Sequence, residues 1–557
     1  MDGGDWFPDG HDVGWYPEDG DVGNIPEYYD GYEGEDFLPE DYYMPEDADW
    51  YPEDMDPYEM QQYMKEIYGE DYLEAADSGG GLSHMDLQEL GSLCIIPTLQ
   101  QGLTMICPLL LLCLTFRLLE GASAWTRHLM STGLGLATLY LVFEANWYFI
   151  VTFAITGHLL LHLMEGSRWR GVAASIMALV FLLTCELFIV EATDWHKIRG
   201  AQMILAMKII SLGFDLDSGV VQATPSFLEY SGYCCFLGTS AFGPWISYND
   251  YLQVLKSRNL SLQWFVRGFM TTLQCLACLT VSTCLANWVI RHDINKWVTA
   301  YRDALSFRFS HYFISYLSEM TCVASGVGVT EKGTTREGEG TDQEEEEDVK
   351  WDLRVARPYH IELPRSLVEV VTNWNRPMHH WLKTYVFKTA KPLGAFPAII
   401  LTYAASAILH GLNFQLAAVL LSLGFYSYIE HVLRQRLADI FSACILAKRC
   451  KPDCGHRNRP NWTGCVGLQL RRDFWKQDWG NLISIEDAKT CICVGLTNLC
   501  FCLLAMFHLA YLGVMFDSSS DVEEEGYTMS HTLQKWAQLD YASHWVAVGS
   551  FVFYKLI

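Results

Sequence analysis

The sequence predicts an all-α polytopic membrane protein. Half of its 557 residues are hydrophobic and 19% are charged, whereas a soluble domain carries about 25% charged residues. Apolar runs long enough to cross a hydrocarbon core of roughly 30 Å recur from residue 92 onward. We therefore expect a bundle of roughly 10–12 transmembrane or re-entrant helices.

The expected spans follow one another along the chain. They lie near residues 92–119, 129–143, 146–165, 171–191, 200–215, 227–247, 264–290, 396–412, 414–432, 433–447, 491–515 and 541–556. Pro97, Pro108, Pro225 and Pro244 interrupt or shorten several of these runs. Interrupted helices are tolerated in a membrane where other helices bury them or where they line a cavity, so we expect a chamber inside the bundle.

Residues 1–85 are predicted to form a disordered, acidic, Tyr-rich tail. Residues 1–80 hold 26 Asp and Glu and one Lys, a charge of −25, together with many Gly and Pro. The whole chain carries −28, so the remaining 477 residues are nearly neutral. No basic face interleaved with aromatic residues stands out, and nucleic-acid binding is not expected.

Two polar segments interrupt the membrane region that we expect over residues 90–557. The insert at 331–348 contains four consecutive Glu and is predicted to be a disordered acidic linker. The loop at 447–480 gathers Lys and Arg between apolar spans. The positive-inside tendency places that loop, and with it the C-terminus, in the cytosol.

The cysteines do not form the pattern of a secreted disulfide framework. Most of the 18, Cys284 among them, lie in apolar stretches, where we expect them to pack as small hydrophobes. One polar group contains Cys450, Cys454, His456 and Cys465. Its spacing is not a standard zinc spacing, so no metal site is predicted, although a zinc-like role for the group stays open.

His410 is the sharpest candidate for chemistry. It ends an apolar run that carries no charge between Lys391 and Glu430. On a helix, Tyr403, Ser406 and His410 share one face, together with the small Ala407. That face would let a second helix or an acyl chain approach closely. The alternative is a packing helix whose histidine bonds to a neighbouring carbonyl.

Other ionisable residues in or beside apolar spans each allow a functional and a structural interpretation. A carboxylate such as Glu144, Glu186 or Glu191 is costly there unless it is paired or wetted, so it lines an aqueous path or pairs with Arg or Lys. His158 and His162 share a helix face at i and i+4, and packing is favoured over a metal pair because no third ligand accompanies them.

A second cluster is the run Trp374-Asn-Arg-Pro-Met-His-His-Trp381. Its aromatic residues and amides fit a helix at a membrane surface. His379 and His380 are adjacent and project in different directions on a helix, which argues against a two-histidine metal site.

This run, followed 35 residues after Asn375 by His410, resembles the signature of the membrane-bound O-acyltransferase (MBOAT) family. Further stretches resemble one branch of that family: 195–203, 211–217, 242–247, 362–365, 404–411 and 543–545. Asp215 and Asp217, in the second of these stretches, have no assigned role. The resemblance implies an MBOAT-type bundle around an intramembrane reaction chamber in the endoplasmic reticulum membrane.

The resemblance also implies a reaction and a site. A cis-Δ9 monounsaturated palmitoleoyl chain would move from palmitoleoyl-CoA, the acyl donor, to a serine hydroxyl of a Wnt protein, with no bound cofactor and no metal. His410 would be the general base and Asn375 its partner amide. Trp374, Tyr403 and Ser406, close to the signature, are expected to contact the substrate.

Three alternatives remain open. Within the enzyme class, the chain would acylate another secreted protein or a lipid alcohol. Outside it, broken helices with buried acids and histidines are also found in transporters. A membrane chaperone of Wnt proteins would be compatible with the same sequence.

Overall fold

The structure is a computed structural model that describes residues 86–119, 121–256, 261–290, 295–331, 349–351, 353–448, 485–516 and 529–557. The chain divides into two units, Met1–Glu70 and Asp71–Ile557, and all described residues belong to the second. The predicted acidic tail lies outside the described residues. So do nearly all of the insert at 331–348 and of the basic loop at 447–480, with the Cys450, Cys454, His456 and Cys465 group.

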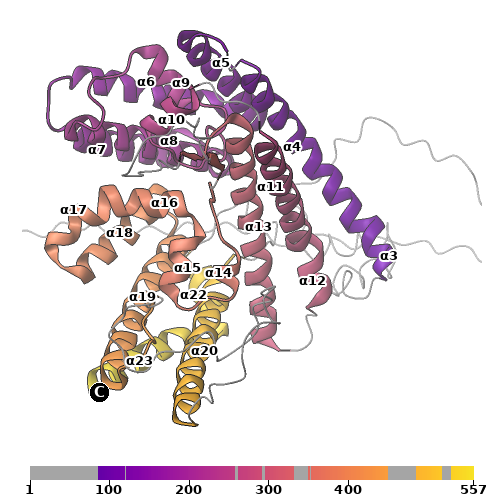
Figure 1. The fold of residues 1–557 in the computed structure, drawn as a ribbon, viewed down its shortest axis with the longest axis vertical. Coiled ribbons are helices and arrows are strands. Elements are labelled where there is room, and N and C mark those ends of the chain that lie inside the picture. Colours follow the sequence, from indigo (N-terminus) through magenta and orange to yellow (C-terminus); the bar gives the residue numbers. More distant parts are fainter. Residues whose placement is uncertain are drawn as a thin grey trace, which may run out of the picture. The chain divides into compact units, whose positions relative to one another are not determined.

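The first part of the bundle is built from helices only (Figure 1). In chain order they are α3 Leu87–Leu90, η2 Gly91–Ile95, α4 Ile96–Arg117, α5 Ala124–Phe143, η3 Glu144–Asn146, α6 Trp147–Leu163, α7 Arg170–Thr184, η4 Cys185–Ile189, α8 Ala192–Ser218, α9 Phe227–Cys234, α10 Tyr248–Val254, α11 Leu262–Thr280, η5 Val281–Leu285, α12 Ala286–Val289 and α13 Lys296–Ser325.

The second part begins with the antiparallel strands β1 Val329–Glu331 and β2 Val349–Trp351. Helices follow: α14 Tyr359–Glu362, α15 Leu367–Trp374, α16 Arg376–Trp381, η6 Leu382–Phe387, α17 Lys388–Ala390, η7 Lys391–Leu393, α18 Ala395–Leu409, α19 Phe414–Phe441, α20 Ile485–Gly513, α22 Met529–Gln538 and α23 Ala542–Leu556. Apart from the small strand pair, the predicted all-α class is confirmed.

Six helical runs among the described residues are long and apolar enough to cross a membrane. They are Leu87–Arg117, Ala124–Leu163, Arg170–Ile189, Leu262–Val289, Phe414–Phe441 and Cys493–Gly513. Large apolar side chains such as Leu111, Ile155 and Phe269 remain exposed on them. Such exposure suits helices whose outer faces contact lipid rather than water.

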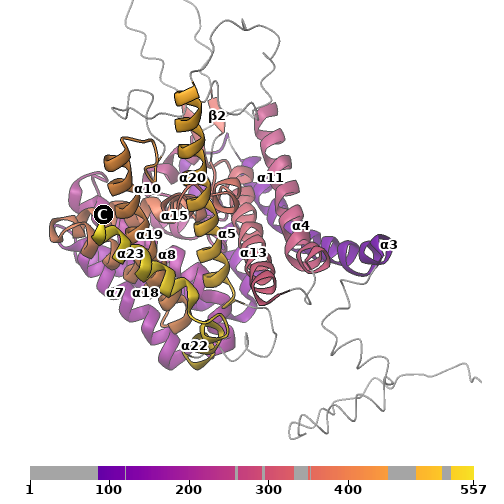
Figure 2. The same cartoon turned by 90° about the horizontal axis from the view of Figure 1, so that it is seen from below.

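Helix α13 is central to the bundle, although the sequence analysis did not predict a span there. It contributes to all three of the larger hydrophobic cores, and it lies between α11 and α20 in both views (Figures 1 and 2). Its charged residues have protein partners: Glu319 pairs with Arg267, and Arg308 with Glu362. Hydropathy alone misses such a helix because other protein elements, not lipid, satisfy its polar side chains.

Two predicted span boundaries were wrong. The spans placed at 414–432 and 433–447 are the single helix α19, which continues because Glu430 and Arg434 pair within it, one turn apart. The span placed at 227–247 is the short helix α9 followed by an irregular stretch with a cis Gly243-Pro244 bond. That stretch is buried in protein, where non-helical backbone is tolerated at membrane depth.

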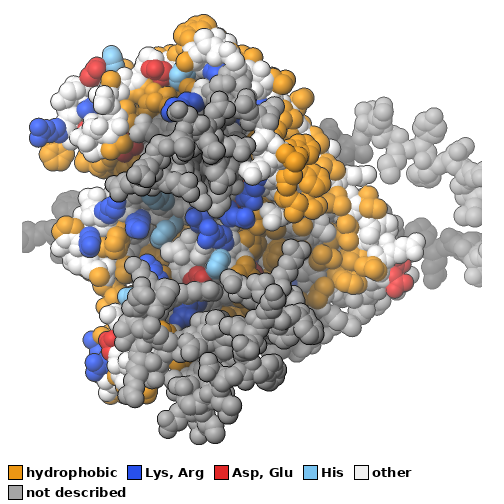
Figure 3. Space-filling model, viewed as in Figure 1, with side chains coloured by type: hydrophobic (Ala, Val, Ile, Leu, Met, Phe, Trp, Pro, Cys, Tyr) orange, Lys and Arg blue, Asp and Glu red, His pale blue; other side chains and the backbone are white. Residues whose placement is uncertain are grey.

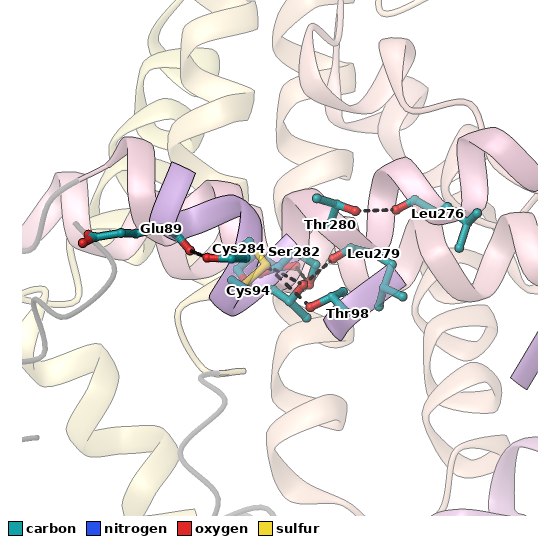
Figure 4. Close-up of a disulfide and its surroundings, with 11 residues drawn as sticks. Glu89, Cys94, Thr98, Leu276, Leu279, Thr280, Ser282 and Cys284 are labelled. Atoms are coloured by element: carbon teal, nitrogen blue, oxygen red, sulfur yellow. Dashed lines mark hydrogen bonds between the residues drawn. A yellow bond between two sulfur atoms is a disulfide. The ribbon is translucent and has the colours of Figure 1, made fainter. Parts of the chain in front are cut away.

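A disulfide joins the first helical run to the run of α11 (Figure 4). Cys94 in η2 is bonded to Cys284 in η5, so the expectation that Cys284 packs as a free thiol was wrong. Near the N-terminal end of α13, Lys296 pairs with Asp540 at 2.6 Å, and η5 is bonded to α13 through Ser282. We call this side of the bundle the disulfide end.

The opposite ends of α4, α11 and α13 meet through an arginine. Arg117 closes α4, lies over the ring of Trp264 at 5.7 Å and contacts Gly326, which ends α13. Trp264, in the first turn of α11, donates its indole N–H to the carbonyl of Val323 at 2.7 Å. We call this side the arginine end. Helix α13 runs from the disulfide end to the arginine end.

Candidate active site

His410 follows the last residue of α18 and caps that helix. Its backbone N–H donates to the carbonyls of Ser406 at 3.3 Å and Ala407 at 3.1 Å. Gly411 comes next with a φ of 93° and donates to the carbonyl of Ile408. A glycine in the left-handed region commonly ends a helix in this way. The half-buried imidazole of His410 therefore lies at the C-terminal end of α18.

Tyr403 packs against α19 within the hairpin of α18 and α19, and Ser406, on the same predicted face of α18, is buried. A Cβ added to Gly424 of α19 would come within 2.8 Å of the Tyr403 ring. Ser406 is 6% exposed. This arrangement is the close helix approach that small residues permit. The role expected for Tyr403 and Ser406 in contacting the substrate stays a prediction.

Two side chains hold the turn after His410, one from within the hairpin and one from η4. Asn413 caps α19 by accepting the N–H of Leu416 at 3.1 Å. Glu186 of η4 accepts the N–H of Leu412 at 2.7 Å. Of the two sequence-based readings of Glu186, pairing is the one observed, but the closest partner is a backbone amide of this turn rather than an Arg or Lys side chain.

Trp374 and Asn375 lie at the junction of α15 and α16. The Asn375 carboxamide oxygen accepts the N–H of Met378 at 3.0 Å and so caps α16. Trp374 lies against α13, with its ring 5.1 Å from the ring of His311 and 6.0 Å from that of Tyr312. His311 of α13 and Arg199 of α8 are ionisable neighbours of His410.

Helix α13 is held firmly where it carries His311. Arg308, one turn earlier, makes two bonds of 2.8 and 2.9 Å to the Glu362 carboxylate. Tyr312 donates its hydroxyl to the same carboxylate at 2.7 Å. A bidentate arginine–carboxylate pair fixes both distance and direction. Glu362 thus anchors the middle of α13 to α14, and the chain continues directly into α15 and Trp374.

A cavity of about 390 Å³ opens at the arginine end. Its lining includes Arg376 and His380 of α16, Arg354, Asp250 and Trp245. Figure 3 shows Lys and Arg side chains gathered near the middle of the face in view, around α16, with His side chains among them. The cavity therefore combines cationic side chains with an aspartate and an aromatic residue, beside the 374–381 run.

The two aspartates without an assigned role bind neighbouring elements. Asp215 accepts the hydroxyl of Tyr385 at 2.9 Å, which joins α8 to η6. Asp217 accepts the N–H of Gly171 at 2.8 Å and pairs with Arg170, so it caps α7. Both aspartates stabilise packing around the site.

Ser543, in the 543–545 stretch, forms a buried pair with His508 of α20. The hydroxyl of Ser543 in α23 is hydrogen-bonded to Nδ1 of His508 in α20 at 2.5 Å. Ser543 is 0% exposed and His508 4% exposed, so no substrate atom reaches the hydroxyl. The pair joins two helices.

The structure thus brings Trp374 near His410 through His311. Asn375 lies at the same helix junction as Trp374, whereas Tyr403 packs on α19 and Ser406 is buried. The sequence analysis missed His311 and Arg199 as members of the site. Arg199 lies within the 195–203 stretch, which was a usable signal. His311 had none, because α13 itself was not predicted.

Comparisons with known proteins identify the family of the chain. The sequence profile of MBOAT, the membrane-bound O-acyltransferase family, matches residues 181–444. The chain is 44% identical over 493 residues to the protein-serine O-palmitoleoyltransferase porcupine of Mus musculus, covering 84% of this chain and 98% of the relative. The porcupine proteins of Homo sapiens and Anopheles gambiae are 43% and 33% identical, over 84% and 77% of this chain and 98% and 84% of the relatives. The chain therefore belongs to the membrane-bound O-acyltransferase family of multi-pass membrane enzymes.

Proposed function

We propose that this enzyme transfers a cis-Δ9 palmitoleoyl chain from coenzyme A to a serine hydroxyl of a Wnt protein. The observation that carries the proposal is the convergence of two signature segments on the middle of α13. The Trp374 ring lies tilted against the His311 ring at 5.1 Å, and His311 is also among the ionisable neighbours of His410. His311 stands about halfway along α13, between the disulfide end and the arginine end.

The two ends of the bundle suit two different substrates. Arg354 and Arg376 line the cavity at the arginine end, and Lys and Arg are enriched on the cytosolic side of membrane proteins. Disulfides persist in the oxidising lumen of the endoplasmic reticulum, which suits Cys94 and Cys284. The proposed location is the endoplasmic reticulum membrane, with acyl-CoA arriving at the arginine end and the secreted acceptor at the disulfide end. In this orientation the C-terminus faces the lumen and not, as the sequence analysis expects, the cytosol, because α20 runs parallel to α13 and Ile557 binds Arg436 on the side where α20 begins.

The proposed reaction needs one base and no redox chemistry. His410 accepts the proton of the serine hydroxyl as the serine oxygen attacks the thioester carbonyl. The carbon–oxygen ester bond forms and the carbon–sulfur bond breaks. The proton on His410 then passes to the departing thiolate, which leaves as coenzyme A. The thioester supplies the activated acyl group, so this step balances without another reactant.

The carboxamide of Asn375 suits the same step. Its carbonyl oxygen caps α16, and its NH₂ group makes no hydrogen bond to the part of the chain that the structure describes. An amide donor aimed at the thioester oxygen stabilises the negative charge that develops there, typically by about 3 kcal/mol. We assign Asn375 this role of positioned donor.

The cavity at the arginine end supports a nucleotide-bearing donor. Coenzyme A carries phosphates, which guanidinium groups bind in a bidentate way, and a flat base, which stacks on aromatic rings. Arg354, Arg376 and Trp245 line the cavity with these groups. Pro377 lines it as well and belongs to the run that holds Asn375, so the donor cavity and the proposed site share one helix.

A transfer assay with three acceptors tests the proposal against its alternatives. Purified enzyme receives alkyne-labelled cis-Δ9 acyl-CoA and a Wnt-derived serine peptide, the same peptide with Ser→Ala, or a lysophospholipid. Labelling of the serine peptide alone is expected. Labelling of the lysophospholipid alone would identify a lipid-alcohol acyltransferase. Absence of transfer by folded enzyme would favour a transporter or chaperone and contradict the proposal.

A further inference from the structure

The turn between α18 and α19 is bound from outside that hairpin by Glu186. The Oε1 atom accepts the backbone N–H of Leu412 at 2.7 Å, across 226 residues of sequence. Glu186 belongs to η4, at the end of the membrane span Arg170–Ile189. The bond therefore ties that span to the turn that begins with His410.

Gly411 lies directly against the Glu186 carboxylate. A Cβ added to Gly411 would stand 2.8 Å from Oε1 and 3.3 Å from both Cδ and Oε2. The glycine also has a φ of 93°, which L side chains rarely adopt. Glycine thus permits both the turn and the approach of the carboxylate, one residue after His410.

Two different interactions are candidates for the role of the Glu186 carboxylate. Trp195 and Arg199 of α8 also interact with it, so one explanation is a charge pair with Arg199. The other is the bond to Leu412. Oε2 is buried and makes no hydrogen bond among the described residues, whereas Oε1 accepts the N–H of Leu412 at 2.7 Å. The two explanations differ in one respect: only the first requires a negative charge.

We propose that Glu186 is a positioning residue, which fixes the imidazole of His410 by holding the N–H of Leu412. This inference rests on the proposed function, because Glu186 acts only through the proposed base. A base must come within hydrogen-bond distance of the proton that it accepts. A displacement of about 1 Å can lower a rate about 100-fold, and freeing the turn allows such a displacement.

Three variants separate the proposed role from a structural one. Glu186→Ala removes the acceptor and is expected to lower kcat about 100-fold, with the KM for acyl-CoA nearly unchanged. Glu186→Gln keeps an acceptor oxygen but no charge, and is expected to retain most of kcat. The matched control is Glu191→Ala, since Glu191 is exposed and makes no capping bond.

Hydrogen exchange of the peptide around Leu412 provides a second measurement that does not need activity. Faster exchange at this turn is expected in Glu186→Ala, but not in Glu186→Gln. Equal losses of kcat in both variants would mean that charge pairing matters, and would overturn the inference. So would full kcat in Glu186→Ala beside an inactive His410→Ala. If His410→Ala itself stays active, the proposed function fails instead, whatever Glu186 does.

Discussion

The ring of Trp374 lies 5.1 Å from the ring of His311, tilted by 34°, and joins the α15–α16 junction to the middle of α13. Aromatic pairs of this kind contribute about 0.5–1.5 kcal/mol beyond burial. Trp374→Ala is therefore expected to lower kcat and loosen the junction, whereas Trp374→Phe should keep most of the activity. Steady-state kinetics of the two variants measure the difference. Equal activity of the Ala variant and wild type would show that this contact does not serve the reaction.

Asn375 has two roles in this account, and substitutions can separate them. Aspartate also caps helices well, but it has no NH₂ group to donate. Asn375→Asp is therefore expected to fold normally and to lose about 100-fold in kcat, the cost of one donor to a developing oxyanion. Asn375→Ala should lose the same activity and, in addition, about 1 kcal/mol of stability.

Thermal unfolding in detergent and kcat, measured on both variants, test this separation. The prediction is contradicted if Asn375→Asp is as active as wild type, because the cap alone would then explain the residue.

The cavity at the arginine end is expected to bind the nucleotide of the donor. Arg354→Ala should raise the KM for acyl-CoA about tenfold, since a hydrogen bond to a charged group is worth about 1.5–3 kcal/mol. Lys296→Ala is the matched control, because that cation pairs with Asp540 at the disulfide end. A donor built on pantetheine, which lacks the nucleotide, should give the same KM with wild type and Arg354→Ala. A persistent difference with that donor would contradict nucleotide binding at Arg354.

The Cys94–Cys284 bond is expected to form in the cell. Microsomes unfolded without reductant, treated with a maleimide and digested, should yield one peptide pair linked through these two cysteines. Cys113, a buried free thiol, should be alkylated in the same sample and serves as the control. Alkylation of Cys94 and Cys284 without reductant would show that the bond is absent, and would remove one support for placing this end in the lumen.

The sequence predicted those parts of the protein whose residues face lipid or belong to a continuous motif. The apolar run before His410 and the run from Trp374 are each local, and both appear as helices in the structure. Helix α13 was missed because Arg308 and Glu319 lower its hydropathy while their partners, Glu362 and Arg267, come from distant segments. Pairing across such distances leaves no periodic pattern to read.

The same reason explains what was missed at the site. Glu186 was noticed as a costly carboxylate, but its partner is a backbone N–H, and every residue except proline offers one. No residue type near position 412 could have marked it. The contact depends on how the span containing η4 packs against the hairpin of α18 and α19, which only the three-dimensional structure provides.

The central claim is that His410 acts as the base in acyl transfer to serine. Its most direct test is single-turnover transfer from labelled palmitoleoyl-CoA to the serine peptide by wild type and His410→Ala, with donor binding measured on both. The variant is expected to bind the donor normally and to lose about 100-fold or more in the rate of transfer, the usual scale of general-base catalysis. A variant that binds the donor and transfers the chain at the wild-type rate would contradict the claim.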